Sequence, residues 1–84
     1  MPIRTAQEIY DELSIVVHDV FDDDSIVVTP QLTAADVEGW DSMGNVSLFL
    51  AIEQSFCVRF GAGEISEIRN VGELVDLIAR KQMG

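Results

Sequence analysis

The sequence has little of what secreted, nucleic-acid-binding or disulfide-stabilised proteins need. It contains one cysteine in 84 residues, Cys57, so no internal disulfide can form and a reducing compartment is expected. Only 5 residues are Lys or Arg, against 15 Asp or Glu, which gives a formal net charge of −10. Such a surface repels nucleic acid phosphates and anionic membranes and attracts proteins with basic patches. We therefore expect protein partners and no nucleic acid.

Long hydrophobic runs are also missing. Although 48% of the residues are hydrophobic, no apolar run approaches the ~20 residues that span a bilayer. The chain opens directly on an amphipathic pattern, without a recognisable signal peptide. These features predict a cytoplasmic protein with no membrane span.

The short length limits what the chain can build. Residues 1–84 are enough for a single domain with a small core. A deep catalytic cleft beside that core is not expected, so the chain suits a substrate or partner of enzymes better than an enzyme. We expect a monomer, although an exposed apolar strip leaves a dimer contact open.

The first part of the chain predicts a helix and then a long loop. Thr5 and Glu8 have the spacing of a capping box, and apolar residues recur behind them at helical intervals, which predicts a helix over about 6–20. The acidic run 22–24 opposes the helix dipole and ends it. Residues 25–40 predict an ordered loop that apolar side chains hold to the core, with one helical turn near 33–36.

The second half predicts three more helices. The first of these helices begins at Asp41 or Ser42 and runs to about residue 56. Apolar side chains cover more than half of its circumference. A short helix is expected at 64–68, and Asn70 and Glu73 repeat the cap-plus-acid spacing at the start of a last amphipathic helix. The prediction is an all-α four-helix bundle, with three principal helices, one short helix and a long first loop.

Ser42 is the most informative residue, because it lies at the start of an expected helix and the sequence around it supplies no catalytic partner. A serine hydrolase needs a histidine base and an acid. The only histidine is His18, and no Gly-x-Ser-x-Gly elbow surrounds Ser42. Three interpretations stay open: a residue that another enzyme modifies, a plain helix cap, and a small serine hydrolase. No metal site is expected, since the acidic run 22–24 lacks the glycine of a calcium-binding loop.

The segment 39–56 resembles the phosphopantetheine attachment site of acyl carrier proteins, whose usual pattern is Asp-Ser-Leu followed by an apolar helix. Here the pattern is Asp41-Ser42-Met43. The order of the expected helices and the long first loop are also similar to that family. The resemblance implies that Ser42 carries 4′-phosphopantetheine, that Asp41 is recognised by the modifying phosphopantetheinyl transferase, and that the chain has no catalytic residues of its own.

The resemblance further implies a partner surface and an acyl pocket. Partner enzymes with basic patches, namely loading ligases, acyltransferases and synthases, would contact four residues of the second helix: Met43, Val46, Leu50 and Glu53. The acyl chain would lie among core residues: Phe49, Ile52, Ile65, Ile68 and Val75. Any helical bundle of this size also needs those five residues for packing.

Some positions depart from the housekeeping fatty-acid carriers. Gly44, Ser47 and Gln54 stand where acidic residues are common in those carriers, which favours a specialised carrier with its own partners. The string Asp41-Ser42-Met43-Gly44 is also similar to the motif of D-alanyl carrier proteins. The predicted function is a carrier of a thioester-bound acyl group. The alternatives are an aminoacyl carrier and an unmodified acidic interaction module.

Overall fold

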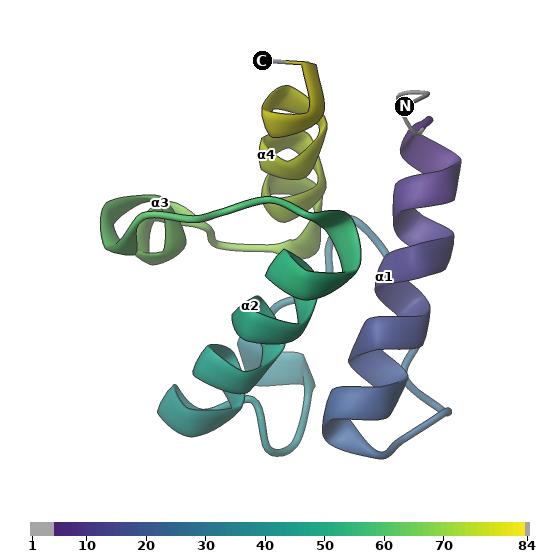
Figure 1. The fold of residues 1–84 in the computed structure, drawn as a ribbon. Helices are drawn as coiled ribbons and strands as arrows, with labels where there is room; N and C mark the ends of the chain where they lie inside the picture. Colours follow the sequence, from purple (N-terminus) through teal and green to yellow (C-terminus); the bar gives the residue numbers. More distant parts are fainter. Residues whose placement is uncertain (1–4, 84) are drawn as a thin grey trace.

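Four α-helices and one 3₁₀ turn make up the regular structure of residues 5–83, the part of the chain that the computed structural model describes (Figure 1). They are α1 (Ala6–Phe21), η1 (Ala34–Asp36), α2 (Ser42–Phe56), α3 (Ala62–Glu67) and α4 (Val71–Met83). The predicted all-helical fold is confirmed, and residues 5–83 contain no strand. None of the described helices is long and apolar enough to cross a membrane.

At each end of α1, capping residues form hydrogen bonds with backbone groups that have no partner within the helix. The Thr5 side chain accepts from the Glu8 backbone N–H at 3.1 Å, and the Glu8 carboxylate accepts from the Thr5 N–H at 2.8 Å. This reciprocal pair is the capping box that the sequence predicts. At the other end Asp22 adopts a left-handed conformation with φ 51° and donates its N–H to the His18 carbonyl. The acidic run thus ends α1 by backbone geometry, one residue later than predicted.

The loop between α1 and α2 is ordered, as the sequence predicts. The His18 ring nitrogen Nε2 lies 2.7 Å from the Ile26 carbonyl oxygen, which ties the start of the loop to α1. Further along, the Pro30 and Leu32 carbonyls accept from the first two backbone N–H groups of α4, at 3.0 and 2.9 Å. Apolar loop side chains also pack against the core: Ile26, Val28 and Leu32.

The core is formed by one face each of α1, α2 and α4. In Figure 1, α1 runs along one side of the molecule, with α2 and α4 beside it and α3 on the far side. The buried side chains of this core are Ile9, Leu13, Val16 and Val17 of α1, Leu48, Phe49, Ile52 and Phe56 of α2, and Val71, Leu74, Val75 and Ile78 of α4, joined by Val58. The helices therefore bury the faces that their periodicity indicates.

Cys57 directly follows the last residue of α2. It is exposed, and it caps the C-terminus of α2 in a left-handed conformation with φ 56°. In this position the Cys57 backbone N–H bonds the Glu53 carbonyl while the side chain faces solvent. Its role in the fold is to end α2.

Candidate functional site

Ser42 is the first residue of α2 and is exposed. The cap of the helix is Asp41, whose carboxylate accepts from the Gly44 backbone N–H at 2.9 Å. Within residues 5–83 the Ser42 hydroxyl has no hydrogen-bond partner. The interpretation of Ser42 as a plain helix cap is therefore wrong, since Asp41 caps the helix instead. A serine with an unengaged hydroxyl at a helix start is available for chemistry.

The start of α2 suits an attached anion. The first N–H groups of a helix lack intrahelical partners and point outward, and the helix dipole places partial positive charge there. Asp41 engages the N–H of Gly44, and its carbonyl accepts from Asn45 N at 2.8 Å. The N–H groups of Ser42 and Met43 precede these two bonded donors. They are the donors that a phosphodiester on the Ser42 oxygen would meet.

Two glycines fix the backbone around Ser42. Gly39 has φ +91°, which side chains other than hydrogen rarely allow. A Cβ added to Gly44 would lie 2.2 Å from the Gly39 carbonyl oxygen and 3.1 Å from Cε1 of Phe21. The loop and the first turn of α2 thus touch through backbone atoms, against an aromatic ring of α1. Gly44 is therefore a steric requirement of this site, beyond the change of charge that the sequence suggests.

Trp40 packs between α1 and the Ser42 segment. Its ring centroid lies 5.7 Å from that of Phe21, with 32° between the planes. Its indole Nε1 donates to the Asn45 side-chain oxygen at 2.9 Å. The residue before Asp41 is thereby tied both to α1 and to the first turn of α2. The bond to Asn45 joins the loop before Ser42 to the first turn of α2.

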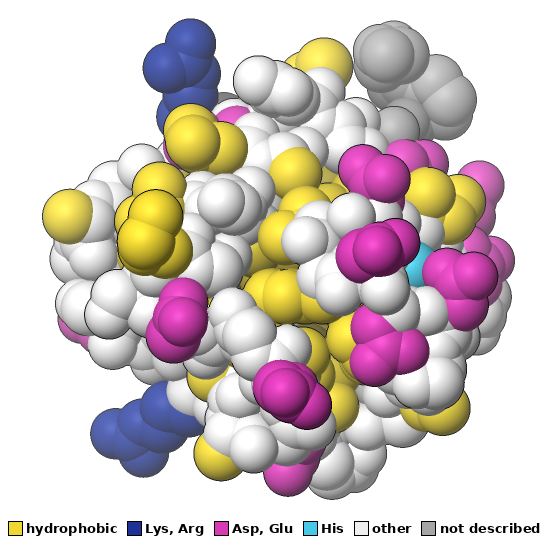
Figure 2. Space-filling view, turned by 90° about the horizontal axis from the view of Figure 1, so that it is seen from below, with side chains coloured by type: hydrophobic (Ala, Val, Ile, Leu, Met, Phe, Trp, Pro, Cys, Tyr) yellow, Lys and Arg dark blue, Asp and Glu magenta, His cyan; other side chains and the backbone are white. Residues whose placement is uncertain are grey.

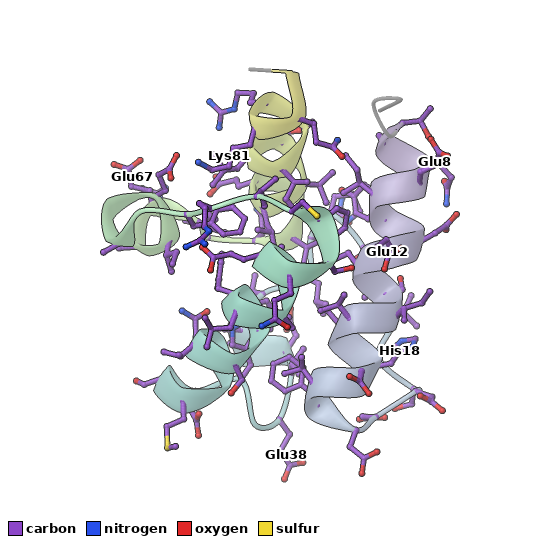
Figure 3. All side chains as sticks on the ribbon, in the orientation of Figure 1. Glu8, Glu12, His18, Glu38, Glu67 and Lys81 are labelled. Atoms are coloured by element: carbon purple, nitrogen blue, oxygen red, sulfur yellow. The ribbon has the colours of Figure 1, made fainter. Side chains whose placement is uncertain are left out.

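The hydrolase interpretation finds no support in the position of His18. This histidine lies on α1, where Figure 3 shows it facing the loop that follows, and its Nε2 is engaged with the Ile26 carbonyl. A base for Ser42 would need a free ring nitrogen within hydrogen-bond reach of the hydroxyl. In residues 5–83 no side chain bonds that hydroxyl.

A strip of apolar side chains runs along the outer face of α2. Met43 is 81% exposed, Val46 60% and Leu50 54%. Positions three and four apart share one side of a helix, so the three form a continuous strip. Glu53, the fourth residue expected on this surface, is partly buried, and its Oε2 accepts from the Phe60 N–H at 2.8 Å. Its carboxylate thus holds the chain after α2 as well as bordering the strip.

A small cleft of about 60 Å³ lies between the start of α2, α3 and the residues before α4. Three of the residues expected to line an acyl pocket line it: Phe49, Ile65 and Ile68. The other two do not, because Ile52 is fully buried and Val75 is 4% exposed within the core. Five further residues complete the lining: Ala34, Trp40, Asn45, Arg69 and Asn70. No local pattern of residues brings these five together, because they come from four separate segments.

Acidic side chains gather near the site without forming a metal centre. Figure 2 views the end of the molecule where α2 begins, and shows apolar side chains in a central hollow, a group of acidic side chains around the histidine, and further acidic side chains elsewhere on this face. Glu38, on the loop before Ser42, points away from the bundle (Figure 3). Hydrogen bonds from Ser25 to its carboxylate hold the pKa of Asp23 below its usual value. Among the described residues no group of side chains could hold a metal ion.

Together, these features define a class: a small acidic helical protein that presents an exposed serine at a helix start beside an apolar strip. No family model matches the chain. The acyl carrier protein of Picosynechococcus sp. is 32% identical over 75 residues, which cover 89% of this chain and 93% of that protein. The acyl carrier protein of Guillardia theta is 29% identical over the same shares.

A solved structure agrees with these relatives. The solution structure of a holo acyl carrier protein from Geobacter metallireducens superposes with a TM-score of 0.84 at 38% identity, covering 88% of this chain and 85% of that one. The chain therefore belongs to the acyl carrier protein family. It is a carrier protein, of the class whose cargo is held on covalent 4′-phosphopantetheine.

Proposed function

We propose that Ser42 is the residue to which 4′-phosphopantetheine is attached, and that the chain carries an acyl group as a thioester at the end of this arm. The observation that carries the proposal is the Ser42 hydroxyl, which is exposed and unbonded while Asp41 caps the helix. The free N–H groups at the start of α2 would stabilise the charge of the resulting phosphodiester.

The modification is a phosphodiester transfer from coenzyme A. The Ser42 oxygen attacks the phosphorus that bears phosphopantetheine and gives its proton to a base of the transferase. The bond from that phosphorus to the adenosine part breaks, and adenosine 3′,5′-bisphosphate leaves. Asp41, exposed directly before Ser42, is the side chain that we expect the transferase to recognise.

The chain itself contributes no catalytic group in this proposal. The flexible arm keeps the thioester at high effective concentration at the active sites of partner enzymes. Loading ligases, acyltransferases and synthases would dock on α2 through the apolar strip of Met43, Val46 and Leu50. The net charge of −10 would draw their basic patches toward this surface. The free, exposed Cys57 fits action in the reducing cytoplasm.

Mass spectrometry tests the attachment. The chain is incubated with coenzyme A and a broad-specificity phosphopantetheinyl transferase, and one phosphopantetheine mass should be added. Ser42→Ala should gain nothing, because the nucleophilic oxygen is gone. Ser47→Ala removes another exposed serine of α2 and should be modified like the wild-type chain. An unmodified wild-type chain, or a modified Ser42→Ala chain, would contradict the proposal.

A further inference from the structure

The first turn of α2 is weak by its own sequence. Gly44 and Asn45 are poor helix formers, and the opening N–H groups of a helix have no partners from a preceding turn. The carboxylate of Asp41 accepts from the Gly44 N–H at 2.9 Å, and its carbonyl accepts from the Asn45 N–H at 2.8 Å. These bonds join residues three and four apart, so they form and break with the turn itself. They do not fix the turn to the rest of the fold.

Trp40 connects this turn to α1. Its indole N–H donates to Asn45 Oδ1 at 2.9 Å, while its ring centroid lies 5.7 Å from that of Phe21, the last residue of α1. Among the described residues, this is the only side-chain hydrogen bond between residues 42–45 and a residue outside α2 and its cap. Because Trp40 and Asn45 are both partly buried, water competes for the bond less than at an exposed site.

The bond encloses the segment that contains Ser42. Its two ends are residues 40 and 45, and the chain between them includes the cap, the serine and the close contact of Gly44 with the Gly39 carbonyl. Ends of helices that lack tertiary contacts open with a free energy near zero. Without this bond, the first turn is therefore expected to be open for a large part of the time.

Attachment at Ser42 requires this turn to be formed. The serine oxygen must reach the phosphorus of coenzyme A in a defined direction, and misplacement of reacting atoms by about 1 Å costs about a hundredfold in rate. A partner that binds only the formed turn has its apparent affinity reduced in proportion to the fraction of chains in which the turn is open.

We infer that Trp40 and Asn45 are positioning residues for the modification of Ser42: their hydrogen bond holds the first turn of α2 in the conformation that the transferase binds. This rests on the proposed attachment at Ser42. Neither side chain touches the reacting atoms in this inference, and both act through the backbone that carries Ser42.

An isosteric replacement of the indole N–H tests the donor. Trp40 is the only tryptophan in the sequence, so a tryptophan auxotroph grown on benzothienylalanine replaces this N–H by sulfur and changes no other residue. The KM of the transferase for this chain should rise about two- to fivefold. The kcat should not change, because the turn is formed in the bound complex. Incorporation of a fluorotryptophan keeps the N–H and should leave KM as in the wild-type chain.

Asn45→Leu tests the acceptor. It removes the oxygen at similar side-chain size, and leucine is the better helix former, so local propensity alone predicts a firmer turn and no rise in KM. We expect KM to rise as it does for the sulfur analogue. The two replacements combined should have no larger effect than either alone, because both remove the same bond.

Asn70→Leu is the matched control at another helix start. The Oδ1 of Asn70 accepts from the Glu73 N–H at 2.9 Å at the beginning of α4. Its loss should lower the melting temperature but leave the KM of the transferase unchanged. The comparison separates positioning of Ser42 from general stability of the fold.

Amide hydrogen exchange measures the first turn without any transferase. The N–H groups of Gly44 and Asn45 should exchange faster in the sulfur analogue and in Asn45→Leu, by at least the factor by which KM rises. Their exchange in Asn70→Leu should match that of the wild-type chain.

The outcomes separate the two proposals. No mass gain on the wild-type chain would reject the attachment and with it the positioning role. Modification with an unchanged KM in the sulfur analogue and in Asn45→Leu would reject the positioning role alone. The same role would be rejected if the two effects multiplied when combined, if Asn70→Leu raised KM equally, or if the exchange of Gly44 and Asn45 did not change.

Discussion

At the scale of single residues, the neighbours of Ser42 each have a separate structural role. Asp41 caps α2, Gly39 and Gly44 allow the loop and helix to touch, and Trp40 bonds Asn45. Because these residues cap the helix and hold the loop against it, the Ser42 side chain is not needed for either purpose. Ser42 can therefore remain exposed at the end of a rigid helix.

Gly44→Ala tests the backbone contact. In an open helix position alanine is more favourable than glycine by about 1 kcal/mol. Here its Cβ would lie 2.2 Å from the Gly39 carbonyl oxygen, and overpacking of this kind costs about 1–3 kcal/mol. We expect a lower free energy of unfolding in urea denaturation. Gly63→Ala is the control, because nothing lies within 4 Å of its added Cβ, and it should be neutral or stabilising. A stabilised Gly44→Ala chain would contradict the contact.

At the scale of elements, an ion pair joins α3 to α4, and partly buried Ile65 and Ile68 pack against the core. The Glu64 carboxylate accepts from the Gly61 N–H at 2.8 Å and from Lys81 Nζ of α4 at 2.9 Å. Figure 3 shows Lys81 on α4 toward α3, and Glu67 pointing away from the molecule. The Gly61 N–H first, and Lys81 second, hold the pKa of Glu64 below 4.5, its usual value. The carboxylate is thus stabilised in its charged form.

Glu64→Gln should reveal this bond as a pH-dependent stability. A carboxyl group whose folded pKa is depressed stabilises the fold above its unfolded value of 4.5 and loses that effect as pH falls through the folded pKa. We expect the variant to melt at a lower temperature than the wild-type chain near neutral pH. The difference should shrink below pH 4.5, because protonated Glu64 resembles glutamine.

Glu67→Gln provides the matched control on the same helix. Among the described residues its side chain makes no hydrogen bond or ion pair, so its melting temperature should follow that of the wild-type chain at each pH. A deficit of Glu64→Gln that stayed constant down to acid pH would show that charge on Glu64 is not the cause.

At the scale of the whole molecule, the net charge of −10 is carried by a small protein, so its acidic side chains lie close to one another. The Cα extents are 33 × 26 × 22 Å. The Debye length is about 30 Å at 0.01 M salt and about 10 Å at 0.1 M. At low salt every acidic residue therefore repels most of the others, while at moderate salt only neighbours interact.

We expect the melting temperature to rise between these two salt concentrations. Screening weakens the self-repulsion of the compact state, and differential scanning calorimetry measures the effect. Asp24→Asn removes one charge at an exposed position and should reduce the rise. A melting temperature that stayed level or fell with salt would contradict a role of self-repulsion in stability.

The sequence by itself determined the order of the helices, their ends to within one or two residues, and the residue that is modified in our proposal. Capping pairs such as Thr5 with Glu8, apolar periodicity and the Asp41-Ser42 motif are local, since the atoms involved lie within one or two turns of each other. For this reason the four helices and the loop agree closely with expectation.

Only the tertiary structure decided how the surroundings of Ser42 are built. It turned Gly44 into a steric requirement, and placed Ile52 and Val75 in the core while Asn45, Arg69 and Asn70 line a cleft. These relations join α1, the loop, α2 and the start of α4. The distances between separate elements depend on how whole helices pack, and no local pattern of residues records them.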